Sequence, residues 1–149
     1  MSRILLVFIL LLFTYIQVNT IEAFTTKQFV LVGDSMLKND SYVEPEHNIT
    51  QLLKQENYQV TCLAKDNALV GDMYAQINNF KDLNEGAYYI ISAGGNNILQ
   101  HRDMDVAFRT YKRFILKLSK YIPDSKIILC TIYYPPTHRH YFEQIKEWN

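Results

Sequence analysis

A chain of 149 residues, of which 48% are apolar and 20% charged, has the composition of one globular domain, and this excludes an intrinsically disordered protein. The 15 basic residues balance the 15 acidic residues, so the sequence offers no strongly positive surface for nucleic acid or for an anionic membrane. No group of His, Cys and acidic residues has the spacing of metal ligands, and no glycine-rich phosphate-binding motif is present. We therefore expect no metal ion, no cofactor and no nucleic-acid partner.

The first 23 residues form a segment of their own. Arg3 precedes an apolar run from Ile4 to Phe13, and Ala23 follows a short polar stretch. This order is typical of a secretory signal peptide that is cleaved near Ala23. An uncleaved membrane anchor is the alternative, although a span needs roughly 20 apolar residues. Either reading predicts that residues 24–149 are a secreted or membrane-anchored domain outside the cytoplasm.

Two sequons fit an exported protein. Asn39-Asp40-Ser41 and Asn48-Ile49-Thr50 are N-glycosylation motifs. Both are candidate glycan sites if the host pathway is eukaryotic.

Short apolar runs then alternate with stretches of helical periodicity. The continuous apolar runs predict strands buried on both faces, at Gln28–Gly33, Tyr58–Lys65, Ala87–Gly95 and Ser125–Pro136. Apolar residues three or four positions apart predict helices between these runs, at Ile49–Asn57, Val70–Leu83 and Asp103–Tyr121, and the chain ends with a loop and the beginning of a further helix. The alternation predicts an α/β fold of the flavodoxin-like three-layer α/β/α class. We expect a mostly parallel sheet with strand order 2-1-3-4.

This strand order keeps the two cysteines apart. Cys62 and Cys130 would lie on strands that are separated by two others. Strands about 4.8 Å apart put them roughly 14 Å from each other, whereas a disulfide needs a Cα separation of about 4.4–6.8 Å. We expect two free, buried thiols.

Small and polar residues follow the first three predicted strands. These residues are Gly33-Asp34-Ser35 after the first strand, Asp66, Asn67 and Gly71 after the second, and Gly94-Gly95-Asn96-Asn97 after the third. Ligands of open parallel sheets bind beyond the carboxyl ends of the strands. We therefore expect the three segments to meet at one edge of the sheet and to form a site.

In order and context the three segments resemble the sequence blocks of the SGNH hydrolase superfamily, also called GDSL esterases and lipases. Gly33-Asp34-Ser35 resembles the first block, Gly71 the second, and Gly94-Gly95-Asn96-Asn97 the third, and the likeness covers residues 28 to 136. It implies that Ser35 attacks the carbonyl of a small ester, such as an acetylated carbohydrate or a lipid-like molecule.

The resemblance also implies roles for the other residues of these blocks. The backbone N–H groups of Ser35 and Gly71 and the side-chain amide of Asn96 would form the oxyanion hole, where the loss of one donor typically costs about 10²–10³ in rate. The substrate-binding residues would be Asp34, Gly94, Gly95 and Asn97. The family usually has Asp at the position of Asn97.

A serine nucleophile needs a base that accepts its proton. In the family this base belongs to an Asp-x-x-His motif that follows a fifth strand, and this sequence contains no such motif. His138 and His140 follow the fourth predicted strand, so they are candidate substitutes, with Glu143 as the nearest carboxylate. A solvated loop of His and Arg is the alternative interpretation.

Two functions therefore stay open. The first is a serine hydrolase of the SGNH type, if a base is supplied. The second is a catalytically incomplete domain that binds a ligand or a partner in the same cleft. Relative to the family the chain is expected to be truncated before the fifth strand, as a fragment or as a natural variant. Truncation would leave the edge of the fourth strand open to a partner.

Overall fold

The computed structural model of the protein describes residues 26–133 and 139–149. The predicted leader at 1–23 and the candidate base His138 lie outside these residues. Within the described ranges, no helix combines the length and the apolar character needed to cross a bilayer. The signal peptide and the anchor at 1–23 both stay predictions.

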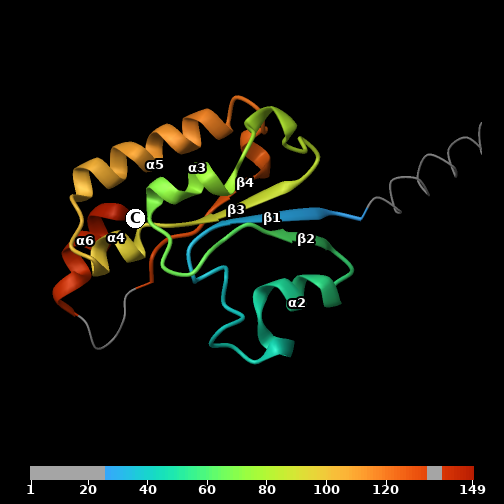
Figure 1. Ribbon diagram of the computed structural model, residues 1–149, viewed down its shortest axis with the longest axis horizontal. Helices are drawn as coiled ribbons and strands as arrows, with labels where there is room; N and C mark the ends of the chain where they lie inside the picture. Colours follow the sequence, from blue (N-terminus) through green and yellow to red (C-terminus); the bar gives the residue numbers. More distant parts are fainter. Residues whose placement is uncertain (1–25, 134–138) are drawn as a thin grey trace, which may run out of the picture.

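Four parallel strands make up the sheet in the described part of the chain, in the order β2-β1-β3-β4 (Figure 1). The strands are β1 (Gln28–Gly33), β2 (Gln59–Cys62), β3 (Tyr88–Ser92) and β4 (Ile127–Leu129). The predicted α/β class and the predicted strand order are confirmed. Because all four strands run the same way, their carboxyl ends gather at one side of the sheet, which we call the carboxyl edge.

Helices and short 3-10 turns connect the strands. The helices are α2 (Ile49–Gln55), α3 (Met73–Gln76), α4 (Gly95–Leu99), α5 (Met104–Leu118) and α6 (Phe142–Trp148). The 3-10 turns are η1 (Pro45–His47), η2 (Val70–Asp72), η3 (Phe80–Asp82), η4 (Asp124–Lys126) and η5 (Arg139–Tyr141).

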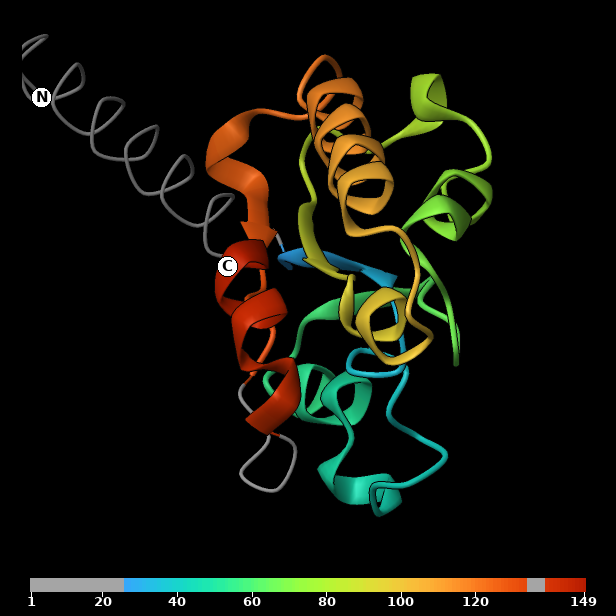
Figure 2. The same ribbon diagram turned by 90° about the vertical axis from the view of Figure 1, so that its left-hand side faces the viewer.

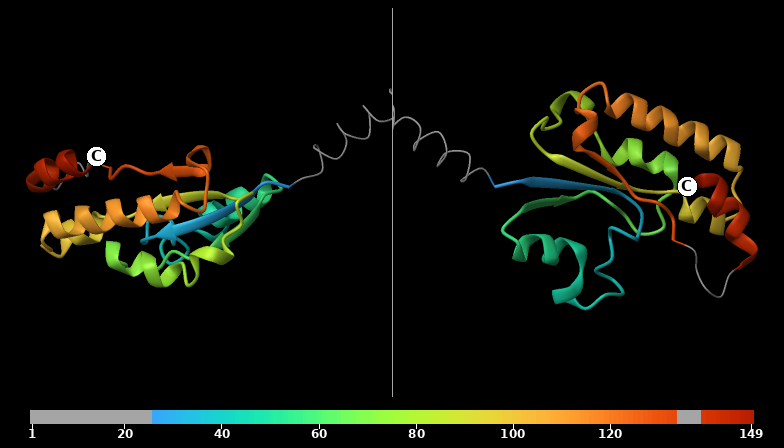
Figure 3. Two further views of the ribbon diagram at one scale, coloured as in Figure 1. Left: turned by 90° about the horizontal axis from the view of Figure 1, so that it is seen from above. Right: turned by 180° about the vertical axis from the view of Figure 1, so that it is seen from behind.

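The domain has three layers. Helices α3 and α5 lie over one face of the sheet and α2 lies over the other (Figures 1 and 3). The side chains of β1 alternate between these layers, because Val30 and Val32 pack in the cluster with α3 and α5 while Leu31 packs with α2. Both faces of β1 are covered, which explains why its sequence is a continuous apolar run. Burial of each such side chain contributes about 1.5–3 kcal/mol to folding.

Helix α5 follows the sequence pattern closely. The carboxylate of Asp103 caps its first turn by accepting a hydrogen bond from the N–H of Val106 at 2.9 Å. Phe114 and Leu118 are fully buried against the sheet. The apolar spacing of the helix predicted at Asp103–Tyr121 places Phe108 on the buried face. In the structure Phe108 is 47% exposed, and its ring packs against that of Trp148 on α6.

The prediction of a single helix over Val70–Leu83 is wrong. The segment divides into η2, the four-residue helix α3 and η3. Helix α3 ends at Gln76, because Ile77 leaves the helical conformation with φ −94° and ψ 83°. Asn79 then begins η3, since its side chain accepts a hydrogen bond from the N–H of Lys81 at 3.1 Å. The residues of the predicted stripe are nevertheless buried, namely Val70, Met73, Ile77 and Phe80.

The third and fourth predicted strands are too long. The third ends at Ser92, and Gly95 already begins α4. The fourth ends at Leu129. Three residues later the N–H of Ile132 donates to Oδ1 of Asn149 at 2.7 Å, and Nδ2 of Asn149 donates to the carbonyl of Ile132 at 2.8 Å. The side chain of Asn149 thus takes the place of a neighbouring strand at this position.

Two predictions about single residues also need correction. Cys62 and Cys130 are free, as predicted, but both are half-buried rather than buried, because β2 is an edge strand and Cys130 faces a cavity. The structure speaks against a glycan at Asn48, which is 6% exposed and caps α2 by accepting a hydrogen bond from the N–H of Gln51 at 2.9 Å. The sequon at Asn39 stays a prediction.

Candidate active site

The turn that carries Ser35 begins at a glycine that the fold requires. Gly33 ends β1 with φ +136°, and a Cβ there would lie 1.7 Å from the carbonyl oxygen of Ser92 on β3. The buried side-chain amide of Gln76 holds Gly33 from the other side, accepting from its N–H at 2.7 Å and donating to its carbonyl at 2.8 Å. The backbone that enters the turn is therefore fixed by two neighbouring elements.

Asp34 shapes the turn from within. Its side chain is 3% exposed, and Oδ1 accepts hydrogen bonds from the N–H of Met36 at 3.1 Å and from Oγ of Ser92 at 3.3 Å. Burial raises the pKa of the Asp34 carboxyl, and the hydrogen bonds from Met36 and Ser92 oppose this rise. The structure assigns Asp34 a role in the geometry of the turn, and its contact with substrate stays a prediction.

Ser35 is half-buried at the end of this turn. Its carbonyl oxygen accepts a hydrogen bond from the hydroxyl of Tyr42. The N–H groups of Leu37 and Lys38 both donate to the carbonyl of Asp34 at 3.1 Å and close a helical turn around the serine. Ser35 therefore sits on an ordered backbone at the carboxyl edge, where the sequence predicts a nucleophile.

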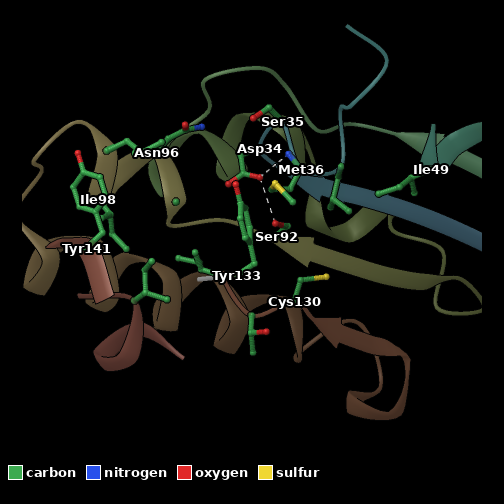
Figure 4. A pocket seen from close by; sticks show the side chains of 16 residues that line it. Asp34, Ser35, Met36, Ile49, Ser92, Asn96, Ile98, Cys130, Tyr133 and Tyr141 are labelled. Carbon is green, nitrogen blue, oxygen red and sulfur yellow. Dashed lines mark hydrogen bonds between the residues drawn. The ribbon is translucent and has the colours of Figure 1, made fainter. Parts of the chain in front are cut away.

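Ser35 and Asn96 line the same cavity, which has a volume of about 500 Å³ (Figure 4). The loop after β1 forms one wall and the segment Cys130–Tyr133 after β4 forms the opposite wall. Helix α4, η5 and α6 contribute residues between them, namely Gly95, Asn96, Ile98, Leu99, Tyr141 and Ile145. Figure 2 looks onto the carboxyl edge and shows α4 and α6 on either side of this region.

The two asparagines of the third block hold the loop of the second block. Nδ2 of Asn96 donates to the carbonyl of Ala68 at 3.0 Å, and the buried Oδ1 of Asn97 accepts from the N–H of Val70 at 3.1 Å. A side-chain amide carries two N–H bonds, so Asn96 keeps a second donor for another acceptor. Asn97 is 6% exposed, and the hydrogen bond that its side chain makes is the one with Val70. Its contact with substrate stays a prediction.

Gly71 lies beside a different hollow. It borders a volume of about 420 Å³ together with Asn97 and Arg102, whereas Ser35 and Asn96 border the first cavity. A Cβ at Gly71 would meet no atom within 4 Å, so packing of the described residues does not require a glycine here. The loop itself is fixed, because the carboxylate of Asp72 accepts from the N–H of Leu69 at 2.7 Å. The structure thus brings Ser35 and Asn96 together and leaves the part of Gly71 in the oxyanion hole as a prediction.

The two glycines of the third block have different surroundings. Gly95 lines the cavity at the beginning of α4. Gly94 is buried with φ +107°, and a Cβ there would lie 2.4 Å from Cε2 of Trp148. Gly94 therefore lets α6 pack closely against the turn, and its contact with substrate stays a prediction.

The candidate bases are not at the cavity wall in the described residues. His140 is exposed on η5, with its ring 4.0 Å from the ring of Tyr141, and it is Tyr141 that lines the cavity. His138 lies outside the described residues. No cluster of three His, Cys, Asp or Glu side chains in 26–133 or 139–149 has a geometry for a metal ion.

Several cavity residues were missed by sequence reasoning. Cys130 and Ile132 follow the fourth strand at the carboxyl edge, so the same rule that selected the other segments could have found them. Burial raises the pKa of the Cys130 thiol, with the Asp34 carboxylate as a further cause. Ile145 had no such signal, because only the folding of α6 back onto the domain brings it to the wall.

Comparison with solved structures agrees with this architecture. The chain is 17% identical to TesA with a TM-score of 0.66, over 82% of this chain and 68% of TesA. For the SGNH-hydrolase family esterase AlinE4 the identity is 16% and the TM-score 0.62, over 83% of this chain and 70% of AlinE4. For a member of the lipolytic protein G-D-S-L family from Veillonella parvula the identity is 18% and the TM-score 0.63, over 83% of this chain and 72% of that protein.

The chain has the fold of the SGNH hydrolases. No protein-family model and no curated protein matches the sequence. At 15–18% identity the likeness to solved structures shows the SGNH fold, and the esterase activity named for AlinE4 is a property of that protein. The SGNH fold places the turn after β1 and the turn after β3 side by side at the carboxyl edge, as the pairing of Gly33 with Ser92 shows.

Proposed function

We propose that the protein is a serine hydrolase that cleaves a small carboxylic ester. The observation that carries this proposal is that Ser35 and Asn96, from turns after two adjacent strands, line one cavity at the carboxyl edge of an SGNH fold. The cavity is large enough for a small-molecule substrate, since such sites span about 300–1,000 Å³.

In the proposed reaction, Oγ of Ser35 forms a bond to the carbonyl carbon of the ester while a base takes the hydroxyl proton. The negative charge on the former carbonyl oxygen is stabilised by the N–H of Ser35, the second amide hydrogen of Asn96 and the N–H of Gly71. The alcohol then leaves with a proton from the same base. Water hydrolyses the acyl-serine ester and releases the acid and free Ser35.

The proposed base is His138 or His140. Both follow β4, so the chain carries them toward the carboxyl edge. The neighbour of His140, Tyr141, lines the cavity, so His140 is one residue away from the cavity wall in sequence.

A second candidate function is the binding of a ligand without catalysis. It is favoured by one observation: no histidine is among the described residues that line the cavity with Ser35. A serine hydroxyl without a positioned base is a weak nucleophile, so the same cavity would then hold its ligand unchanged.

A fluorophosphonate probe distinguishes these functions, because it labels only an activated serine. We expect labelling of the full-length chain that is lost in Ser35→Ala and kept in Ser41→Ala, a control at an exposed serine of the same loop. His138→Ala or His140→Ala should reduce labelling, and the variant that does so identifies the base. Folded protein that gives no labelling at Ser35 would refute the hydrolase and favour the binding function.

We also infer that residues 1–23 direct the protein out of the cytoplasm, as a secreted or membrane-anchored protein. The support is the basic flank and the apolar run that follows Arg3. N-terminal sequencing of the protein recovered from its native host tests this: a mature terminus near Ala23 supports secretion, and an intact Met1 in the membrane fraction supports an anchor. An intact terminus in the cytoplasmic fraction contradicts both.

A further inference from the structure

Beyond Ser35 and Asn96, the cavity is lined largely by apolar side chains. Its wall includes Met36, Ile98, Ile132 and Ile145, which come from four different segments of the chain. No Lys or Arg is among the described lining residues, and the carboxyl of Asp34 is 3% exposed and already accepts two hydrogen bonds. The described lining residues therefore offer no cationic side chain for an anionic substrate group.

The polar and apolar parts of the cavity are separated. Figure 4 shows Ser35 and Asn96 along one side, with Cys130 across the cavity from them and Ile98 and Tyr141 toward one end. A ligand that places a carbonyl at Ser35 therefore directs the rest of its acyl group along apolar side chains. This arrangement suits a molecule with one polar group and a long apolar part.

Several exposed side chains of the wall are largely apolar as well. Met36, Leu99 and Tyr133 are 48%, 57% and 60% exposed while they line the cavity. A ligand that covers these side chains gains hydrophobic free energy that an empty cavity does not have. The hydroxyls of a sugar would gain little here, because a hydroxyl that loses water without a new hydrogen bond is penalised.

We propose that the acyl group of the substrate is an unbranched apolar chain of about eight to ten carbons that lies between α4, α6 and the segment Cys130–Tyr133. This inference rests on the proposed ester hydrolysis and selects a lipid-like ester over an acetylated carbohydrate. An acetyl group would leave most of a cavity of about 500 Å³ unfilled.

A series of 4-nitrophenyl esters tests the chain-length preference. We expect kcat/KM to rise about threefold to fourfold for each added methylene from the acetyl to the octanoyl ester, since each methylene enters the apolar cavity. Cys130→Trp should fill the cavity and remove this rise, whereas Cys130→Ser, which keeps the size of the side chain, should retain it. A flat series, or a preference for the acetyl ester, overturns the proposal while leaving ester hydrolysis intact.

A binding measurement separates this inference from the hydrolase itself. In a Cys62→Ser background Cys130 is the only thiol, because the chain has two cysteines. We expect 1-decanol to slow the alkylation of Cys130 by N-ethylmaleimide at least tenfold and ethanol at the same concentration to leave it unchanged. Protection without any ester hydrolysis supports the apolar-chain site and refutes the hydrolase. Equal alkylation with both alcohols in folded protein overturns the inference.

Discussion

The side-chain amide of Gln76 pairs with both backbone polar groups of Gly33, at 2.7 and 2.8 Å, and it does so in the buried interior. Gly33 ends β1 and immediately precedes Asp34 and Ser35. Gln76 of α3, which is 43 positions away in sequence, thus holds the backbone at the end of β1, two residues before the proposed nucleophile. The buried amide of Gln76 has hydrogen-bond partners because Gly33, the last residue of β1, presents its N–H and carbonyl to it.

Replacing Gln76 with Met should destabilise the fold and displace the turn of Ser35. The substitution keeps the length of the side chain but leaves the N–H of Gly33 without an acceptor, at about 1–3 kcal/mol, while the carbonyl of Gly33 still accepts from the N–H of Lys65 at 3.1 Å. Urea unfolding monitored by circular dichroism measures the loss. Gln51→Met on the exposed surface of α2 is the matched control and should stay within about 0.5 kcal/mol of the parent. Equal stabilities of the two variants would contradict the structural role of Gln76.

Two glycines of the proposed site should respond in opposite ways to substitution by alanine. Gly33→Ala should cost about 3 kcal/mol or more, because the new Cβ would collide with the carbonyl of Ser92 at a φ of +136°. Gly71→Ala should change the stability by less than about 0.5 kcal/mol, because its Cβ points into open space.

Gly71→Ala keeps the backbone N–H, so its kcat/KM on esters should stay close to that of the parent. Gly71→Pro lacks this N–H and should lose about 10²–10³ in kcat/KM if the N–H of Gly71 donates to the oxyanion. Thermal unfolding and ester hydrolysis on one protein preparation give both quantities. Full activity in a folded Gly71→Pro protein would remove Gly71 from the oxyanion hole.

Asn97 should matter for stability through its hydrogen bond to Val70. Asn97→Ala leaves the buried N–H of Val70 without an acceptor and should cost about 1–3 kcal/mol. Asn97→Asp keeps an oxygen acceptor at the same place and should cost less than the alanine variant. Urea midpoints compare the two, with Asn78→Ala at an exposed position as the control. The interpretation fails if the aspartate and alanine variants are equally destabilised.

The buried carboxyl of Asp34 should make stability depend on pH. Burial raises its pKa above the ordinary value of 3.8, so at intermediate pH the folded protein binds more protons at this group than the unfolded chain does. The contribution of Asp34 to stability is therefore greatest below pH 3.8 and decreases as the pH rises through the raised pKa. Asp34→Asn keeps an acceptor for Met36 and cannot ionise, so it should gain stability relative to the parent as the pH rises.

The measurement is the difference in unfolding free energy between Asp34→Asn and the parent, taken from urea titrations between pH 3 and pH 7. Asp66→Asn, at an exposed carboxylate of the same edge, reports the effect of removing one negative charge from the surface. A difference for Asp34→Asn that shrinks with rising pH would contradict the sign derived from burial.

Trp148 should report whether α6 is an integral part of the fold. It is the only tryptophan of the chain, and its ring lies 5.9 Å from that of Phe108 and 5.3 Å from that of Tyr111. We expect the change in tryptophan fluorescence during urea unfolding to coincide with the loss of helical circular dichroism, as in a two-state transition. Fluorescence that changes at a lower urea concentration would show that α6 separates first.

The sequence predicted the class of fold and the order of the strands because both depend on local patterns. A strand covered on two faces needs a continuous apolar run, as in β1, and a helix on one face needs a periodic stripe, as in α5. The turn residues that follow β1 and β3 then had to meet, because parallel strands end at the same edge. These relations do not depend on how segments distant in sequence pack against one another.

Other features depend on contacts between segments that no local pattern encodes. The periodic stripe from Val70 to Phe80 did not reveal that the helix ends at Gln76, and the apolar run after Ile127 did not reveal that Asn149 takes the hydrogen bonds of Ile132. The apolar cavity next to Ser35 belongs to this second group, since Ile145 reaches it only through the docking of α6.

By itself the sequence determined that Ser35 stands at the end of a buried parallel strand, because hydrophobic burial fixes the strand and glycine permits the turn. Only the tertiary structure decided what surrounds the serine. Gln76 hydrogen-bonds to Gly33 at the start of the turn, Asn96 hydrogen-bonds to the carbonyl of Ala68, and the segment Cys130–Tyr133 lines the same cavity as Ser35. Such long-range contacts depend on the shape of the whole domain, and short-range patterns of apolar and polar residues do not specify them.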